Sequence, residues 1–354
     1  MKKIILTGGG TAGHVTPNIA LLPHLKDEGY EVHYIGSYNG IEKTLIENLG
    51  IKYYGISSGK LRRYLSIKNF TDLFRILKGM VQAKKLIKTI NPDVVFSKGG
   101  FVTVPVVRAA GKKKIPTLIH ESDMSPGLAN RLASKYATKV CCNFPETVNM
   151  IADNKGILTG TPIREELKQG DRMAGLNYCK FNTVKPVIMV IGGSLGAVRV
   201  NEAVRAILPR LLEKFQIIHV CGKGKTDPSF YNTTGYCQFD YVTDELKDLF
   251  AAADIVISRA GANVICELLA MRKPNLLIPL SAEASRGDQI LNAKSFKNQG
   301  FSSVLEESEL SDNLFYDTII SLYENRDKYI KAMEEGAQGD SIKKIIGLIK
   351  EVSK

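Results

Sequence analysis

Two glycine-rich loops, each placed between a short apolar strand and a helix, are the strongest constraint on how this 354-residue chain can fold. The first loop is residues 8–14, after the apolar run 3–7, and the second is residues 192–196, after the apolar run 187–191. Glycine lets backbone amides approach a ligand closely, and the N-terminus of the following helix favours negative charge. Two such loops therefore predict two nucleotide-binding halves that face a shared cleft.

Short β-like runs alternate with helical stretches along the whole chain, which predicts βαβ units and parallel sheets. Gly160, Thr161 and Pro162 interrupt this alternation, and the polar segment that follows marks a domain boundary there. The fold class is therefore α/β, with two Rossmann-like domains at residues 1–162 and 163–337. The predicted strands are 3–7, 31–36, 52–56, 93–97, 116–120, 138–142, 187–191, 216–220, 236–239, 254–258 and 275–279.

Charge is concentrated in the first half of the chain. Residues 1–160 hold 23 Lys and Arg against 11 Asp and Glu, which accounts for the entire net charge of +12. This basic excess indicates an anionic partner, either nucleic acid, a membrane surface or a phosphorylated substrate, unless it is an ordinary solvated surface. The apolar runs are too short to cross a bilayer, and Lys2 and Lys3 lead directly into a strand, so the cytoplasm is the expected compartment.

The first loop carries Gly8, Gly10 and Gly13 in the spacing typical of dinucleotide-binding turns. No acidic residue follows the second predicted strand, where a nicotinamide enzyme would bind ribose, and this argues against a dehydrogenase. His14 comes directly after the loop, where a helix N-terminus disfavours the imidazolium form. His14 is therefore either a neutral base or an ordinary capping or core histidine.

Two further polar clusters follow strands of the first half. Gly99 and Gly100 come after the run 94–97, and residues 120–123 close the next strand with the sequence His-Glu-Ser-Asp. The carboxyl ends of strands in an open α/β sheet form its ligand crevice, so we expect these clusters to lie near His14.

The second half also has polar residues after its predicted strands, and these residues are suited to binding a sugar nucleotide. Amides around Ser194 are suited to a diphosphate, with about 1 kcal/mol added by the helix behind them. Glu267 can accept hydrogen bonds from a ribose diol, and Asp288 and Gln289 are suited to sugar hydroxyls. The loop around Ser194 is also compatible with a tight turn that binds no ligand, and each of the other residues is equally compatible with a helix cap or a solvated loop.

Residues 67–88 form a basic amphipathic stretch. Its apolar residues follow helical spacing and its lysines surround them, which predicts either a membrane-surface helix or a helix packed on its own domain. The predicted membrane patch consists of Phe70, Leu73, Phe74, Leu77, Lys78 and Lys84.

Taken together, these segments resemble the MurG family of bacterial glycosyltransferases (glycosyltransferase family 28) over nearly the full length. The resemblance implies the GT-B fold, with a C-terminal helix at about 338–354 packing back on the first domain. It implies transfer of N-acetylglucosamine (GlcNAc) from UDP-GlcNAc to the C4 hydroxyl of N-acetylmuramic acid (MurNAc) in undecaprenyl-linked lipid I, without a cofactor or a required metal. It also implies a peripheral location on the cytoplasmic face of the cell membrane, an anionic leaflet and other cell-wall synthesis proteins as partners, and no nucleic acid.

The resemblance also implies roles for individual residues. His14 is the candidate base and Asp123 the second candidate. The donor-binding residues would be Thr11, Ala12, Gly13, Arg164, Ser194, Arg259, Glu267, Asp288 and Gln289. The acceptor-binding residues would be Gly13, His14, Gly99, Gly100, His120 and Asp123.

Three other functions stay open at this stage. A UDP-GlcNAc 2-epimerase and a diacylglycerol glycosyltransferase share the expected fold. The epimerase would not need the basic amphipathic stretch. A basic nucleic-acid-binding protein would explain the charge but not the donor-type residues.

Overall fold

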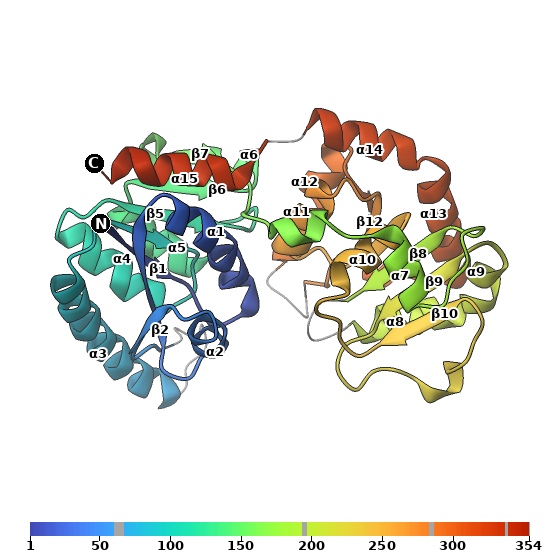
Figure 1. Cartoon of the computed structure of the whole chain (residues 1–354), viewed down its shortest axis with the longest axis horizontal. Coiled ribbons are helices and arrows are strands. Elements are labelled where there is room, and N and C mark those ends of the chain that lie inside the picture. Colours follow the sequence, from blue (N-terminus) through green and yellow to red (C-terminus); the bar gives the residue numbers. More distant parts are fainter. Residues whose placement is uncertain (60–66, 193–196, 283–286, 337–338, 354) are drawn as a thin grey trace. The chain divides into compact units, whose positions relative to one another are not determined.

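The computed structural model describes residues 1–59, 67–192, 197–282, 287–336 and 339–353. At the start of the helix that begins at residue 67, it does not describe the side chains of residues 67–71 and 73. The chain divides into two compact units (Figure 1). Unit 1 contains Met1–Arg164 together with Gln338–Lys354, and unit 2 contains Glu165–Ala337. The predicted boundary at residue 162 lies two residues before this division.

Unit 1 is built on a seven-stranded sheet with the order β3-β2-β1-β4-β5-β6-β7, in which every pairing is parallel. Its strands are β1 (Lys2–Thr7), β2 (Tyr30–Ser37), β3 (Lys52–Ile56), β4 (Val94–Ser97), β5 (Thr117–Glu121), β6 (Lys139–Cys142) and β7 (Gly156–Leu158). Its helices are η1 (Ala12–His14), α1 (Thr16–Asp27), α2 (Ile41–Glu47), α3 (Ile67–Ile90), α4 (Thr103–Lys112), α5 (Leu128–Ala133), η2 (Ser134–Tyr136), α6 (Pro145–Met150), η3 (Ala152–Asn154) and α15 (Ser341–Val352).

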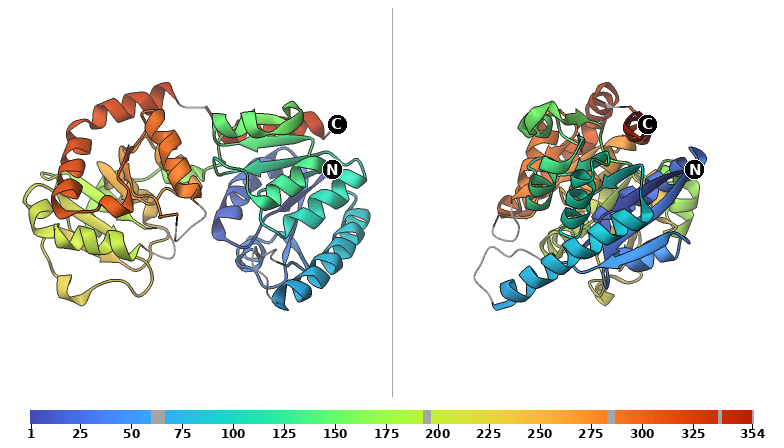
Figure 2. Two further views of the ribbon diagram at one scale, coloured as in Figure 1. Left: turned by 180° about the vertical axis from the view of Figure 1, so that it is seen from behind. Right: turned by 90° about the vertical axis from the view of Figure 1, so that its left-hand side faces the viewer.

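Successive residues of β1 pack into cores on opposite faces of this sheet. Ile4 and Leu6 contact the core that α1 and α15 cover, whereas Ile5 belongs to the core beneath α3 and α4. Burial on both faces explains why the strands are nearly continuous apolar runs, as is usual in parallel sheets. The long helix α3 is visible along its whole length in Figure 2.

The C-terminal helix α15 completes the first of these cores. Ile342, Ile345, Ile346 and Ile349 are buried against it, at a spacing that places them on one helical face. Burial of each isoleucine contributes about 1.5–3 kcal/mol. Tyr30 and Ser353 also share a short hydrogen bond of 2.5 Å, so both ends of the chain belong to unit 1.

Unit 2 repeats the architecture with a six-stranded parallel sheet in the order β10-β9-β8-β11-β12-β13. Its strands are β8 (Val187–Ile191), β9 (Gln216–Val220), β10 (Tyr236–Phe239), β11 (Ile255–Ser258), β12 (Asn275–Leu277) and β13 (Ser303–Val304). Its helices are η4 (Glu165–Lys168), α7 (Arg172–Tyr178), α8 (Val198–Ala206), α9 (Leu208–Lys214), η5 (Pro228–Phe230), α10 (Leu246–Ala252), α11 (Ala262–Ala270), α12 (Asp288–Asn298), η6 (Glu307–Glu309), α13 (Asp312–Glu324) and α14 (Arg326–Glu335). The prediction of two α/β domains with parallel sheets is confirmed.

Candidate active site

The first glycine loop begins where β1 ends, at the carboxyl edge of the unit 1 sheet. A Cβ on Gly8 would lie 2.3 Å from the carbonyl oxygen of His14, and Gly10 adopts a φ of +90°. Both positions therefore require glycine, because a side chain would collide with the backbone at one and be strained at the other.

A buried carboxylate holds this loop from inside the protein. Glu42 is fully buried, and its Oε1 accepts hydrogen bonds from Ser37 N (3.0 Å) and Ser37 Oγ (2.6 Å). Its Oε2 accepts a bond from Gly10 N at 3.3 Å. One amide of the loop is therefore bound to an internal anion, and a ligand must use other groups. No local pattern indicates this burial, because Glu42 reads as an ordinary polar position of α2.

The hydrogen bonds of His14 Nδ1 make Nε2 the ring nitrogen that can accept a proton. Its Nδ1 lies 3.0 Å from the carbonyl oxygen of Gly9 and 3.2 Å from Thr11 Oγ1. A carbonyl oxygen can only accept, so Nδ1 carries the proton and the lone pair of the neutral ring resides on Nε2. This tautomer fits the predicted role of His14 as a proton acceptor, and that role stays a prediction.

The second glycine turn packs directly on the first loop. Gly99 and Gly100 have φ values of +97° and +92°, and a Cβ on Gly100 would lie only 2.3 Å from the carbonyl oxygen of Gly9. The structure thus brings the Gly99–Gly100 turn together with the loop that carries His14, as expected from their positions at the ends of neighbouring strands.

His120 lies inside the domain, whereas its position at the end of a strand predicts a place in the ligand crevice. Its ring is fully buried, its Nε2–H donates to the Gly160 carbonyl at 2.9 Å, and its Nδ1 accepts from Lys98 Nζ at 3.0 Å. Burial, and then the Lys98 ammonium, hold the pKa of His120 well below its usual range. His120 therefore supports the site from beneath, and no acceptor can reach it in this structure.

Lys98 is buried beside the candidate site, which its sequence context does not indicate. It is 1% exposed, although it reads as a surface lysine beside a glycine turn, and its ammonium also donates to Ser122 Oγ. The backbone of Ser122 is held separately by Asn143 Nδ2 at 2.9 Å. The residue before Asp123 is thus fixed from two sides.

Glu121 organises the loop that carries Asp123. Its carboxylate accepts hydrogen bonds from Asp123 N (3.0 Å), Gly127 N (3.0 Å) and Asn130 Nδ2 (2.9 Å). Burial raises the pKa of Glu121, while the Asn130 amide opposes this shift. Asp123 is thereby placed at the carboxyl edge of β5, the strand next to β4.

Two of the predicted donor residues of unit 2 lie near strand ends, since Arg259 follows β11 and Gln289 contacts the segment after β12. Asp288 is the first residue of α12, and Gln289 Oε1 accepts a hydrogen bond from Leu280 N at 3.0 Å. Glu267 lies half-buried on α11. Arg259 follows β11, but its guanidinium donates to the carbonyls of Ile278 (3.2 Å) and Pro279 (3.3 Å) and to buried Glu307. In this structure Arg259 supports the turn rather than presenting its charge to a ligand.

Two donor predictions have little or no structural description. Ser194 lies outside the described residues, so its proposed contact with a diphosphate stays a prediction. Arg164 is half-buried, and its Nε is buried without a hydrogen-bond partner among the residues that the structure describes. Within the same residues, no three His, Cys, Asp or Glu side chains gather as a metal site.

The amphipathic stretch forms α3, and its two faces differ in burial. Asp72, Gly79, Ala83, Ile87 and Ile90 are buried at a spacing of three to seven residues, on the face toward the sheet. On the opposite face Phe74, Leu77 and Val81 are 73%, 51% and 70% exposed, and Lys78, Lys84, Lys85 and Lys88 are exposed among them. The side chains of Phe70 and Leu73 lie outside the description. No helix in the described parts of the chain has the length and apolar character to span a membrane.

Comparison with known proteins identifies two domains of one glycosyltransferase family in the chain. Residues 4–142 match the glycosyltransferase family 28 N-terminal domain, and residues 187–349 match the family's C-terminal domain. A relative from Lachnospira eligens is 64% identical over 354 residues, covering all of both chains, and one from Clostridium novyi is 59% identical over 353 residues, covering 99% of each. Both are named UDP-N-acetylglucosamine--N-acetylmuramyl-(pentapeptide) pyrophosphoryl-undecaprenol N-acetylglucosamine transferase.

Solved structures show the same fold. The crystal structure of Acinetobacter baumannii MurG is 25% identical and superposes with a TM-score of 0.77, covering 99% of this chain and all of the other. A UDP-N-acetylglucosamine 2-epimerase from Listeria monocytogenes reaches 0.71 at 14% identity, which is a likeness of fold alone. With two family 28 domains, the GT-B fold and relatives of 64% identity over its whole length, the chain belongs to the MurG family of glycosyltransferases.

Proposed function

We propose that the protein transfers GlcNAc from UDP-GlcNAc to the C4 hydroxyl of MurNAc in undecaprenyl-pyrophosphoryl-MurNAc-pentapeptide, with inversion at the anomeric carbon. The observation that carries this proposal is the pair of glycine turns packed on each other beside His14 in unit 1, in a member of the MurG family. Unit 1 takes the acceptor and unit 2 takes the donor.

The reaction proceeds as one displacement in this proposal. The acceptor C4 oxygen attacks the anomeric carbon of GlcNAc and gives its proton to His14 Nε2, while the bond from that carbon to the diphosphate oxygen breaks and UDP leaves. The Nδ1–H bond to Gly9 fixes the ring in the tautomer that can accept the proton. The diphosphate gains negative charge, which backbone amides near Ser194 and the Arg164 guanidinium would stabilise.

The glycine turns have a separate role toward the acceptor. Their backbones lie at the carboxyl edge of β1 and β4 without side chains, so an acceptor pyrophosphate can approach the main chain there. Gly10 N is already bound to Glu42, and Gly99 N donates to Ser97 Oγ at 3.4 Å, so the amide of Gly100 is the donor assigned to the acceptor pyrophosphate.

A direct transfer assay tests this function. The full-length protein, UDP-GlcNAc and a short-chain analogue of the prenyl-pyrophosphoryl-MurNAc-pentapeptide acceptor should yield a disaccharide product and UDP in equal amounts. Diacylglycerol in place of this acceptor should give no product. UDP-N-acetylmannosamine formed without acceptor would indicate an epimerase, and disaccharide absent under all conditions would overturn the proposal.

We further propose that the exposed face of α3 holds the protein on the anionic cytoplasmic face of the membrane. Apolar side chains at positions 74, 77 and 81 lie among four lysines, the pattern of helices that rest in a membrane interface. Each lysine near an anionic leaflet contributes about 1 kcal/mol of attraction.

Vesicle sedimentation checks this proposal. A variant with Phe74→Ser, Leu77→Ser, Lys78→Gln and Lys84→Gln should lose at least about tenfold in affinity for anionic vesicles, because two charges and two apolar contacts are removed. A control with Lys294→Gln and Lys297→Gln on α12 loses the same charge from unit 2 and should sediment as the unmodified protein does. Equal retention of both variants would exclude α3 as the binding face.

A further inference from the structure

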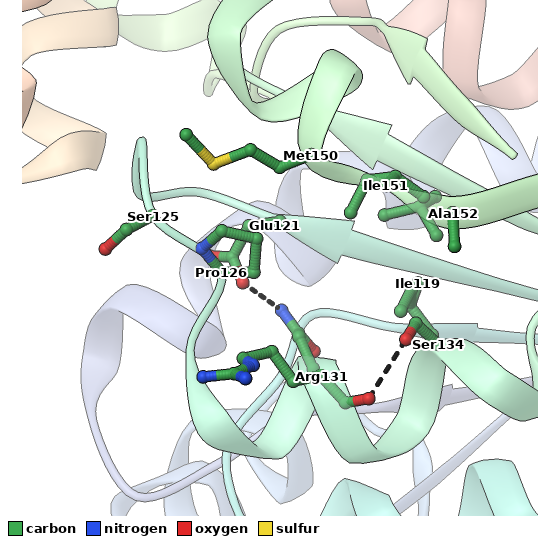
Figure 3. A pocket seen from close by; sticks show the side chains of 11 residues that line it. Ile119, Glu121, Ser125, Pro126, Arg131, Ser134, Met150, Ile151 and Ala152 are labelled. Carbon is green, nitrogen blue, oxygen red and sulfur yellow. Dashed lines mark hydrogen bonds between the residues drawn. The ribbon is translucent and has the colours of Figure 1, made fainter. Parts of the chain in front are cut away.

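A pocket of about 420 Å³ lies inside unit 1, beside the loop that carries Asp123 (Figure 3). Its walls come from β5, from the loop after it, from α5 and η2, and from the end of α6. The lining residues are Ile119, Glu121, Ser125, Pro126, Asn130, Arg131, Ser134, Val140, Met150, Ile151 and Ala152. The volume is in the range that holds a small organic ligand or a short peptide segment.

The wall of the pocket contains one buried hydrogen-bond acceptor that the protein does not use. Asn130 is 8% exposed, and its Nδ2 donates both to the His120 carbonyl (3.0 Å) and to Glu121 Oε2 (2.9 Å). These two acceptors fix which end of the amide is the nitrogen. Asn130 Oδ1 is buried and has no hydrogen-bond partner in the described part of the chain. Burying an unsatisfied polar atom is costly, but this oxygen is closed to solvent, so a ligand that donates a hydrogen bond can satisfy it only after the Asn130 side chain turns toward the pocket.

The charges at the pocket favour a ligand with a carboxylate. Glu121 is the acidic residue of the lining, and its oxygens already accept three N–H bonds within the protein. Arg131 is exposed on α5, and among the described residues no carboxylate forms an ion pair with it. A guanidinium at the rim can bind a carboxylate through two parallel hydrogen bonds.

The remaining lining combines apolar side chains with the hydroxyls of Ser125 and Ser134. Ile119, Val140, Ile151 and Ala152 line one side, and Met150, which is 54% exposed, stands at the edge. Figure 3 shows Met150 and Arg131 on opposite sides of the space that contains Pro126. Apolar side chains beside two hydroxyls, an amide and one cation suit a peptide, whose side chains need apolar contacts, whose backbone needs polar partners and whose free carboxyl end needs a positive charge.

We propose that this pocket binds the peptide arm of the acceptor. The inference rests on the proposed function and adds a binding site to it. In muramic acid the peptide is joined through a lactyl ether at C3, one carbon away from the C4 hydroxyl that is glycosylated. A peptide subsite must therefore adjoin the residues that handle that hydroxyl. Ser125 and Pro126 follow Asp123 by only two and three residues, so the pocket meets this condition.

The peptide would lie in the pocket with a backbone N–H donated to Asn130 Oδ1 and its terminal carboxylate near Arg131. Its side chains would contact Met150 and Ile151. The subsite contributes to acceptor selection rather than to the chemical step, and we expect about a tenfold preference for acceptors that carry the peptide, which corresponds to about 1.4 kcal/mol.

The test compares two soluble acceptors, a short-chain prenyl-pyrophosphoryl-MurNAc with the pentapeptide and the same compound without it. The measured quantity is the ratio of kcat/KM between them. The unmodified protein should give a ratio of about ten, and Arg131→Glu and Met150→Trp should each bring the ratio toward one. The first variant reverses the charge, and the second fills an exposed edge of the pocket where misfolding is not expected. Lys135→Glu is the matched control, because it makes the same charge change on η2 outside the lining and should keep the ratio.

The possible results separate the two proposals. A ratio near one for the unmodified protein, or a ratio that both pocket variants retain, would overturn the peptide subsite while leaving the transferase function intact. Absence of transfer to either acceptor by the unmodified protein would instead contradict the proposed function. Loss of the ratio in Lys135→Glu as well would assign the effect to general charge and also overturn the subsite.

Discussion

Replacing His14 by alanine should lower kcat about 10²–10⁴-fold and leave the affinity for UDP near that of the unmodified protein. The reason is that His14 Nε2 takes the proton of the attacking hydroxyl, whereas the donor is held by residues of unit 2. The measurement is steady-state transfer with both substrates saturating, together with calorimetry of UDP binding. The loss should fall on kcat, because the imidazole acts in the transition state.

His24→Ala is the matched control for this experiment. It removes a histidine from the last turn of α1, the helix that follows η1, and should leave turnover unchanged. Near-normal turnover of His14→Ala would show that the base is another group, and Asp123→Asn would then be the next variant to examine. A large fall in UDP affinity would mean that the substitution disturbs more than the base.

Gly100→Ala should both destabilise the protein and abolish most of the transfer. The residue has a φ of +92°, which costs roughly 1–2 kcal/mol for a residue with a side chain, and the new Cβ would lie 2.3 Å from the carbonyl oxygen of Gly9. Relief of that collision by moving backbone adds about 1–3 kcal/mol. The free energy of unfolding should therefore fall by about 2–5 kcal/mol, and His14 should move because its Nδ1 is bonded to the displaced carbonyl.

Gly29→Ala separates the two contributions. Gly29 has a φ of +76°, but a Cβ there would meet nothing within 4 Å, so only the backbone conformation is strained. Urea unfolding should show a loss of roughly 1–2 kcal/mol and transfer should be unaffected. If Gly100→Ala were no less stable or active than Gly29→Ala, the close contact between the two glycine turns would have no functional weight.

The main elements of the fold could be predicted from the sequence because parallel strands buried on both faces are distinct apolar runs. The two strands that were missed, β7 and β13, are edge strands of three and two residues, too short to produce a pattern. Residues 198–213 read as one continuous helix in the sequence, but the structure divides them into two helices, α8 and α9. Pro209 lies in the first turn of α9, and its missing N–H ends the hydrogen-bond ladder of the preceding helix.

The site was predictable only in part. Glycine turns and polar residues at strand ends have local signals, so their meeting in unit 1 could be expected. The residues that hold these turns and polar groups in place have no such signal in the sequence. Lys98 and Glu42 read as surface charges, and only the tertiary fold buries them against Ser122 and Gly10. His120 reads as a ligand-binding residue for the same reason, since sequence cannot show that both of its nitrogens already have partners inside the protein.

The ribosome does not complete the two units in the order in which it begins them. The first unit to begin is the last to be finished, because the four isoleucines of α15 that close its core are translated only after all of unit 2. A nascent chain must therefore carry an uncovered apolar surface over α1 until termination. We infer that a premature stop between residues 165 and 341, which removes α15, releases a polypeptide prone to aggregation, even though every strand of its first sheet is present.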